Sequence, residues 1–134
     1  KLEKYNKLMN IEATTMVREA RRTYRPVITA YATKVAKGLE TIRAAGAEAV
    51  MQCEQDTLNE LCCGITQINY CIKVLDELHK NAEAIVDGQA QAEVYAHKVA
   101  PAMAELRAAV DAMEEIVAAD YWPVPTYDDI LFYV

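Results

Sequence analysis

Apolar side chains recur every three or four residues along most of the chain, in three successive segments. The first runs from about Ile11 to Ala45 and keeps one face of a helix apolar. Pro26 lies inside it, and an interior proline removes a backbone hydrogen bond and clashes with the preceding turn. We therefore expect a kink there or a short break, with Gly46 as the end of the helix. The apolar positions are Ala20, Tyr24, Ile28, Tyr31, Val35, Leu39 and Ile42.

The second segment, from about Ala47 to Val86, has the clearest period. Its apolar positions alternate in steps of three and four, which predicts a heptad seam, and Asp87-Gly88 then forms a turn. Glycine at position 64 makes helix formation less favourable by about 1 kcal/mol than alanine would. A close approach of another backbone is one explanation for a glycine at this position. The seam consists of Leu58, Leu61, Ile65, Ile68, Ile72, Leu75, His79, Ala82 and Val86.

The third segment runs from about Gln89 to Ala119, and Pro101 is expected to bend it. Because both connections between segments are short, each helix must return alongside the last. The sequence thus predicts an all-α, elongated antiparallel bundle of three long helices, or four if the first breaks at Pro26. We expect one domain, with a lead-in over 1–10, the bundle over 11–120 and a tail over 121–134. The third apolar face consists of Ala92, Ala96, Val99, Met103, Leu106, Val110, Met113 and Val117.

The low content of glycine and proline supports long helices, and the negative net charge argues against polyanionic partners. Only four glycines and four prolines occur in 134 residues, too few for the frequent turns of a sheet protein. The net charge of −6 argues against nucleic acid and anionic membrane surfaces. Arg18, Arg21, Arg22 and Arg25 form the one basic cluster, and Glu19 lies within it. We interpret this cluster as a solvated face or a set of ion-pairing contacts.

The cysteines indicate a reducing compartment. Cys53 and Cys71 would lie roughly 27 Å apart on one helix, too far for a disulfide or a shared metal ion. Cys62 and Cys63 are adjacent and point in different directions. All four are expected to be reduced, partly buried thiols in a cytoplasmic protein. The first residue is Lys1, which suggests a segment excised from a longer polypeptide.

The sequence lacks the residues of a di-metal site and those of a nucleophilic cysteine site. A di-metal bundle needs Glu-x-x-His on two helices and further Glu ligands, and the nearest match is Asp76-x-x-His79. His79 is therefore interpreted as a hydrogen-bonded or partly exposed seam residue, and His97 as a surface or kink-lining residue. Neither Cys62 nor Cys63 has a histidine within reach along its helix, and no glycine-rich phosphate loop occurs. We expect no catalytic, cofactor-binding or metal-binding residue in this chain.

The tail from Asp120 to Val134 differs in character from the helices. It contains the only Trp and the only Phe, and its two closely spaced prolines favour an extended path. Thr126 followed by Asp129 resembles a capping box that opens one helical turn. A tail this apolar is not typical of a disordered linker, so it should dock on its own bundle or on a neighbouring domain. The candidate docking residues are Trp122, Pro123, Pro125, Tyr127, Leu131 and Phe132.

Four stretches together resemble one known family. Residues 101–107 (PAMAELR) and 121–132 (YWPVPTYDDILF) are similar to the C-terminal ending of type III glutamine synthetases. Residues 4–6 (KYN) and 10–16 (NIEATTM) resemble the entry into the last helical region of that family. The resemblance implies that this chain is the C-terminal helical domain of such an enzyme. Those enzymes are cytoplasmic ligases that join ammonia to glutamate using ATP and a divalent metal ion, Mg or Mn, and they assemble as rings.

The resemblance transfers no catalytic residue to this chain, because the metal, nucleotide and glutamate motifs of the family lie upstream of this segment. It implies a non-catalytic domain that contributes to assembly or positions the catalytic region. Its partners would be the catalytic region of the same polypeptide and neighbouring subunits of a homo-oligomer. A free-standing helical interaction module is the alternative, and a metal-binding helical bundle is a further one.

Overall fold

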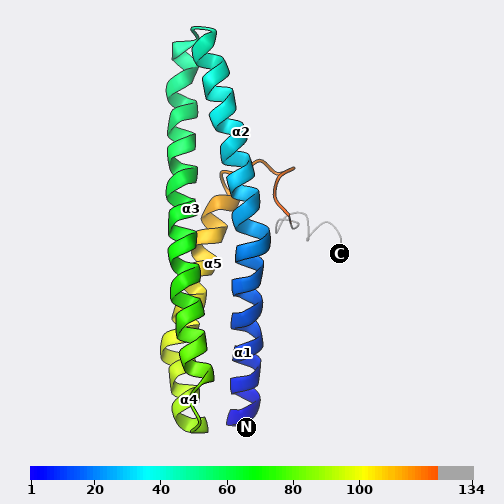
Figure 1. Cartoon of the computed structure of the whole chain (residues 1–134), viewed down its shortest axis with the longest axis vertical. Coiled ribbons are helices and arrows are strands. Elements are labelled where there is room, and N and C mark those ends of the chain that lie inside the picture. The colour runs from blue at the N-terminus through cyan, green and yellow to red at the C-terminus, as the bar shows by residue number, and fades with distance from the viewer. Residues whose placement is uncertain (124–134) are drawn as a thin grey trace.

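A computed structural model describes residues 1–123, and these residues form an elongated helical rod (Figure 1). Three long helical stretches run alternately up and down the rod, which confirms the predicted all-α class with three long helices. Each stretch is helical over most of its length, and the first and third each contain one π-helical turn. The elements are α1 (Leu2–Glu19), η1 (Ala20–Tyr24), α2 (Arg25–Ala44), α3 (Glu48–Glu83), α4 (Gly88–Val94), η2 (Tyr95–Val99) and α5 (Ala100–Glu114).

The first helix begins earlier than the sequence predicted. We expected a lead-in over 1–10 and a helix from about Ile11, but α1 begins at Leu2. Its first turns belong to the bundle, since Asn6 and Met9 are buried. The side-chain amide of Asn6 donates a hydrogen bond to the carbonyl of Gly88 at 3.1 Å, which joins the start of α1 to the start of α4. The third stretch ends at Glu114, before the predicted Ala119.

Both interior prolines follow a π-helical turn. η1 ends at Tyr24, two residues before Pro26, and η2 ends at Val99, two residues before Pro101. A proline ring clashes with the carbonyl four residues earlier, which here lies within the wider π turn. The extra residue of the π turn gives this carbonyl room, so the helix continues through both prolines. The break considered at Pro26 does not occur, and the local distortion is the π turn.

Local sequence signals account for both connections between the long helices. Gly46 has a positive φ of 74°, and its N–H bonds the carbonyl of Arg43. The N–H of Ala47 bonds the carbonyl of Ile42, which completes a Schellman motif and confirms Gly46 as the end of the helix. At the other connection, the carboxylate of Asp87 accepts a hydrogen bond from the N–H of Ala90 at 2.9 Å and caps α4.

The core lies where α1, α2 and α5 each pack on α3, and α3 contributes an almost continuous buried face. The predicted seam of α3 is buried over its C-terminal half, whereas Val86 is fully exposed beyond the end of the helix. In the third stretch, Tyr95 is 1% exposed and the predicted Ala96 is exposed. The largest fully buried side chains are Tyr95, Ile28, Leu61, Ile68, Leu75, Leu106 and Val99.

The third stretch is shorter than the other two. α5 ends part-way along the rod, and beyond it only α2 and α3 continue as a two-helix hairpin (Figure 1). Near the end of α5, the side chain of Met113 lies in the space that a Cβ atom on Gly64 would occupy. Gly64 therefore gives the Met113 side chain of α5 room to pack on α3, and this contact involves a side chain of α5 instead of the backbone considered as one explanation.

Two glycine substitutions should separate this packing effect from helix propensity. Gly38, inside α2, has open space around its Cβ position, so Gly38→Ala should raise the free energy of unfolding by about 0.5–1 kcal/mol. Gly64→Ala gains the same propensity but must displace Met113, so its net effect should be less favourable by about 1 kcal/mol or more. Urea denaturation of both variants measures the difference. Equal stabilisation would show that Met113 does not need the space at Gly64.

Candidate interaction site

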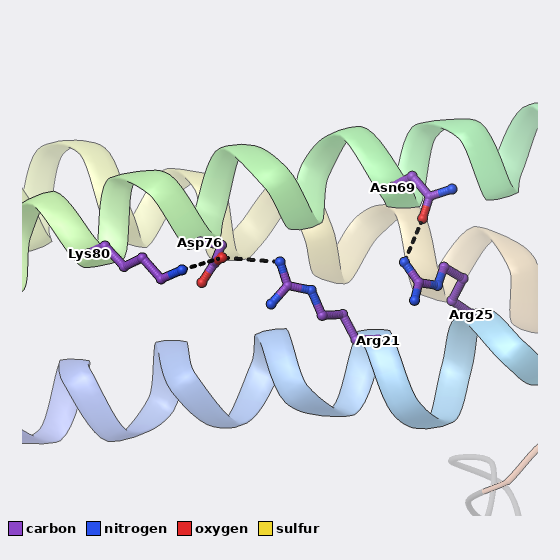
Figure 2. Close-up of polar contacts among 5 residues, drawn as sticks. All are labelled: Arg21, Arg25, Asn69, Asp76 and Lys80. Atoms are coloured by element: carbon purple, nitrogen blue, oxygen red, sulfur yellow. Dashed lines mark hydrogen bonds and ion pairs between the residues drawn. The ribbon is translucent and has the colours of Figure 1, made fainter.

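Polar side chains join the first helical stretch to α3 along one side of the rod. The Arg21 guanidinium and the Lys80 ammonium each lie 3.1 Å from the same carboxylate oxygen of Asp76 (Figure 2). Further along, Arg25 donates a hydrogen bond to the side-chain oxygen of Asn69 at 3.1 Å (Figure 2). Arg21 and Arg25, two of the four clustered arginines, thus make polar contacts between helices. The contact of Arg21 is an ion pair, which was one of the two interpretations of this cluster.

The environment of Asp76 favours its charged form. Burial, with 17% of the side chain exposed, would by itself raise the pKa of the carboxyl group. Hydrogen bonds from Lys80 and Arg21, together with their positive charges, outweigh burial and bring the pKa below its usual value. Asp76 is therefore an ionised partner for two cations, which share one of its carboxylate oxygens.

His79 lies in the same region and is 6% exposed. Its Nε2 atom is hydrogen-bonded to the hydroxyl of Thr14 at 2.9 Å, as expected for a seam histidine, and its buried Nδ1 atom has no partner. Neither ring nitrogen contacts a carboxylate. Within residues 1–123, no three or more His, Cys, Asp or Glu side chains are grouped so that they could hold a metal ion. The donor set around Asp76 and His79 does not fit the divalent metal of the resembled family.

The four cysteines occupy two environments on α3. Cys71 is buried, and burial raises the pKa of its thiol. Cys53, Cys62 and Cys63 are exposed, which differs from the partly buried thiols expected from the sequence. All four are free thiols, as predicted from their spacing.

The beginning of the tail packs on the bundle. The ring of Trp122 lies 5.4 Å from the ring of Tyr24, and the ring of Tyr121 lies 5.2 Å from that of Tyr31. The ammonium of Lys34 lies 5.4 Å from the centre of the Tyr121 ring. Trp122 is 8% exposed, whereas the predicted docking residue Pro123 is exposed. The other candidates, Pro125, Tyr127, Leu131 and Phe132, lie outside the described residues.

A groove runs between α1 and α5, which make few contacts with each other. Its larger part has a volume of about 620 Å³, and a neighbouring part of about 450 Å³ shares four of the same residues. The groove ends at Tyr24, whose ring packs against Trp122. Its apolar lining is contributed by Met9, Ile11, Met16, Ala20, Tyr24, Ala100, Met103, Ala104, Leu106, Ala108 and Val110.

The polar rim of the groove is mainly acidic. Glu12 and Glu19 line it from α1, Asp111 lines it from α5, and Arg107 is the one cation among its lining residues. Burial raises the pKa of the Tyr24 phenol, and the carboxylates of Glu19, Glu114 and Asp111 raise it further. The phenol of Tyr24 is therefore held in its neutral form.

Exposed apolar side chains are concentrated on α1, next to this groove. Among the described residues, four of the seven large hydrophobic side chains that are exposed belong to the first eleven positions of the chain. They follow one another at intervals of three and form what we call the α1 stripe: Leu2, Tyr5, Leu8 and Ile11. Ile11 also lines the groove, so the stripe and the groove are continuous.

The sequence analysis placed its candidate site in the tail and missed the α1 stripe. A signal was present, because residues three apart are neighbours on a helix surface, although four residues at this spacing wind about halfway around the helix. It was overlooked because residues 1–10 were assigned to a lead-in. That these side chains are exposed while Asn6 and Met9 are buried could be known only from the packing of α1.

Comparisons with known protein families and with curated proteins find no match to this chain. No helix in the described part of the chain combines the length and the apolar character needed to cross a membrane. The description of the groove and the α1 stripe therefore rests on the structure of this chain and on no related protein.

We expect the stabilisation provided by Asp76 to depend on pH. A carboxyl group whose pKa is lower in the folded state stabilises the fold above its unfolded pKa, and this contribution is lost as the pH falls through the folded pKa. Asp76→Asn should lower the free energy of unfolding by about 1 kcal/mol at neutral pH. The difference from the wild type should shrink as the pH falls below about 4.

Urea denaturation of the wild type and Asp76→Asn over this pH range measures the effect. Asp56→Asn, a substitution on the exposed part of α3, is the control and should change stability little at any pH. A difference between the wild type and Asp76→Asn that is constant across the range would contradict the ionised pairing.

We expect Trp122 to anchor the tail to η1. Trp122→Ala should lower the free energy of unfolding by about 3 kcal/mol, because it removes a large buried ring and its contact with Tyr24. Tyr70→Ala is the control, since Tyr70 is exposed on α3 and its loss should cost about 0.5 kcal/mol or less. Thermal unfolding followed by circular dichroism compares them. Equal stability of the two variants would mean that Trp122 is not anchored.

Proposed function

We propose that this chain is the non-catalytic C-terminal helical domain of a type III glutamine synthetase, and that it acts by contacts with other parts of the enzyme. The resemblance of residues 101–107 and 121–132 to that family supports the assignment. On this proposal the parent enzyme is cytoplasmic and joins ammonia to glutamate with ATP and a divalent metal ion. We assign no step of that reaction to the residues of this chain.

One observation carries the proposal that this domain works through contacts. Its polar side chains between helices hold the bundle together, as in the pairing of Arg21 and Lys80 with Asp76. Its apolar side chains, by contrast, are left exposed along the α1 stripe beside the open groove. A contiguous exposed apolar surface is typical of an interaction site. The partners on this proposal are the catalytic region of the same polypeptide and neighbouring subunits of a homo-oligomer.

The tail is part of this proposal. Trp122 packs on Tyr24, which favours a tail that begins on its own bundle. The candidate residues beyond it, Pro125, Tyr127, Leu131 and Phe132, are proposed to continue the docking on the bundle or on the catalytic region. Large aromatic side chains are frequent anchors at such interfaces.

A free-standing helical interaction module is the second candidate, and the exposed α1 stripe favours it equally. The encoding gene distinguishes the two. A reading frame that continues for a catalytic region upstream of Lys1 supports the glutamine synthetase domain. A start codon close to Lys1 would support the free-standing module.

We expect the isolated chain to be strongly helical by circular dichroism and to form no glutamine from glutamate, ammonia and ATP. Asp76 makes structural contacts with Arg21 and Lys80, His79 makes one with Thr14, and no metal-holding group occurs within residues 1–123. Detectable turnover by the purified chain would contradict a non-catalytic role.

In the parent enzyme, deletion of residues 121–134 should reduce assembly or cause aggregation, because it removes Trp122 and uncovers Tyr24. The solution mass of the parent with and without these residues measures the effect. An unchanged mass and solubility would show that the tail does not contribute to assembly.

A further inference from the structure

A second hollow lies between the first helical stretch and α3, away from the groove described above. It has a volume of about 470 Å³ and contains three of the four clustered arginines. We call it the basic pocket, because cations outnumber carboxylates among its charged lining residues. These charged residues are Arg18, Arg21, Arg22, Lys80, Asp76 and Glu83.

The positive charge of the basic pocket is local. Four cations and two carboxylates line it, a formal excess of two positive charges in a chain whose net charge is −6. The neighbouring acidic residues of the first stretch, Glu12 and Glu19, line the groove between α1 and α5 instead. On α3, Glu77 follows Asp76 in the sequence and does not line the pocket. An anion that enters the pocket is therefore attracted by its lining.

Two of the four cations have no counter-ion in the protein. Arg21 and Lys80 share one oxygen of Asp76, which they approach from opposite directions along the rod (Figure 2). Arg18 and Arg22 make no hydrogen bond or ion pair with any side chain of residues 1–123. They lie four residues apart on the same side of the helix, and both line the pocket. Their guanidinium groups are thus available to a ligand.

A buried polar atom provides a second indication of a ligand, independent of charge. His79 lines the basic pocket, is 6% exposed and is hydrogen-bonded to the Thr14 hydroxyl through Nε2. Its Nδ1 atom is buried and has no hydrogen-bond partner among the described residues. Buried polar atoms normally have a partner in the protein or in a bound molecule. A polar ligand in the pocket would supply that partner.

We propose that the basic pocket binds the phosphate group of a small, freely diffusing molecule. The donors of a guanidinium group form a planar fork that matches the oxygens of a phosphate group. A phosphate group also has enough oxygens to accept from Arg18, Arg22 and His79 together, whereas a carboxylate has two. The site is additional to the proposed function and does not depend on it.

The shape of the pocket and the charge of the chain favour a small ligand over a polyanion. Its volume lies within the range of roughly 300–1,000 Å³ that is usual for small-molecule sites. Its least exposed polar residues are Asp76, with 17% of the side chain exposed, and His79. Nucleic acid or an anionic membrane would bring many further negative charges against an acidic chain.

Isothermal titration calorimetry of the 134-residue chain with inorganic pyrophosphate tests the proposal. We expect saturable binding of one pyrophosphate per chain. Arg18→Gln/Arg22→Gln should weaken it by about tenfold or more, because charge-assisted hydrogen bonds from both guanidinium groups are lost. Lys37→Gln/Arg43→Gln is the matched control, since it removes the same charge from exposed positions on α2 and should leave the affinity unchanged. Circular dichroism should show the same helix content in both variants.

The two histidines of the chain report where the ligand binds. In protein labelled with ¹⁵N at histidine, pyrophosphate should shift the ring-nitrogen signals of His79, which lines the pocket. The signals of His97, which is exposed in η2, should not move. This comparison needs no substitution and so cannot be confused with a loss of folding.

Three results would overturn the proposal. Absence of saturable pyrophosphate binding at low ionic strength would show that the pocket does not hold a phosphate group. Equal weakening by the two double variants, or equal shifts of both histidines, would indicate a general effect of charge and not a site. Vesicles containing phosphatidic acid that bind the chain through Arg18 and Arg22, without binding of pyrophosphate, would identify a lipid headgroup in place of a free ligand. None of these results bears on the parent gene or on assembly through the tail, so failure here is distinct from failure of the proposed function.

Discussion

Burial of one face of α3 is the constraint on which the rest of the structure depends. α1, α2 and α5 each pack on this helix, and its seam residues Leu61, Ile68 and Leu75 are fully enclosed. Since α3 serves as the common partner, α1 and α5 need not pack closely on each other. The groove between them is a consequence of this arrangement. Its apolar lining is accessible because α1 and α5 both pack on α3 and leave a gap between them.

The two π-helical turns let long helices carry proline without losing continuity. Pro26 and Pro101 each lie two residues beyond such a turn, so the same solution occurs in both outer stretches. Because the first stretch is uninterrupted, α1, η1 and α2 form one continuous helix, and each of them buries residues in the core. Tyr24, at the end of η1, then contacts Trp122 and lines the groove. The π turn before Pro26 thus contributes Tyr24 to the end of the groove.

The first helical stretch makes a charged contact with α3 and leaves apolar side chains exposed. Arg21 of η1 pairs with the ionised carboxylate of Asp76 on α3, while Leu8 and Ile11 of α1 are exposed. An ion pair at this depth contributes modestly to stability, but it opposes rotation of α1 about its own axis because both partners have defined positions. The polar contacts therefore help to keep the apolar side chains of α1 directed away from the core. On the proposal made above, this is what preserves a surface for association.

The sequence by itself determined the helical class, the three long stretches and their turns, because a period of three to four residues and the signals of Gly46 and Asp87 are local properties. It also placed His79 on the seam. Only the tertiary structure decided that α1 begins at Leu2, that Tyr95 is buried in place of Ala96, and that the α1 stripe stays exposed. Each of these depends on which helix packs against which side. That choice is made by contacts between residues far apart in the chain, and a local repeat does not encode it.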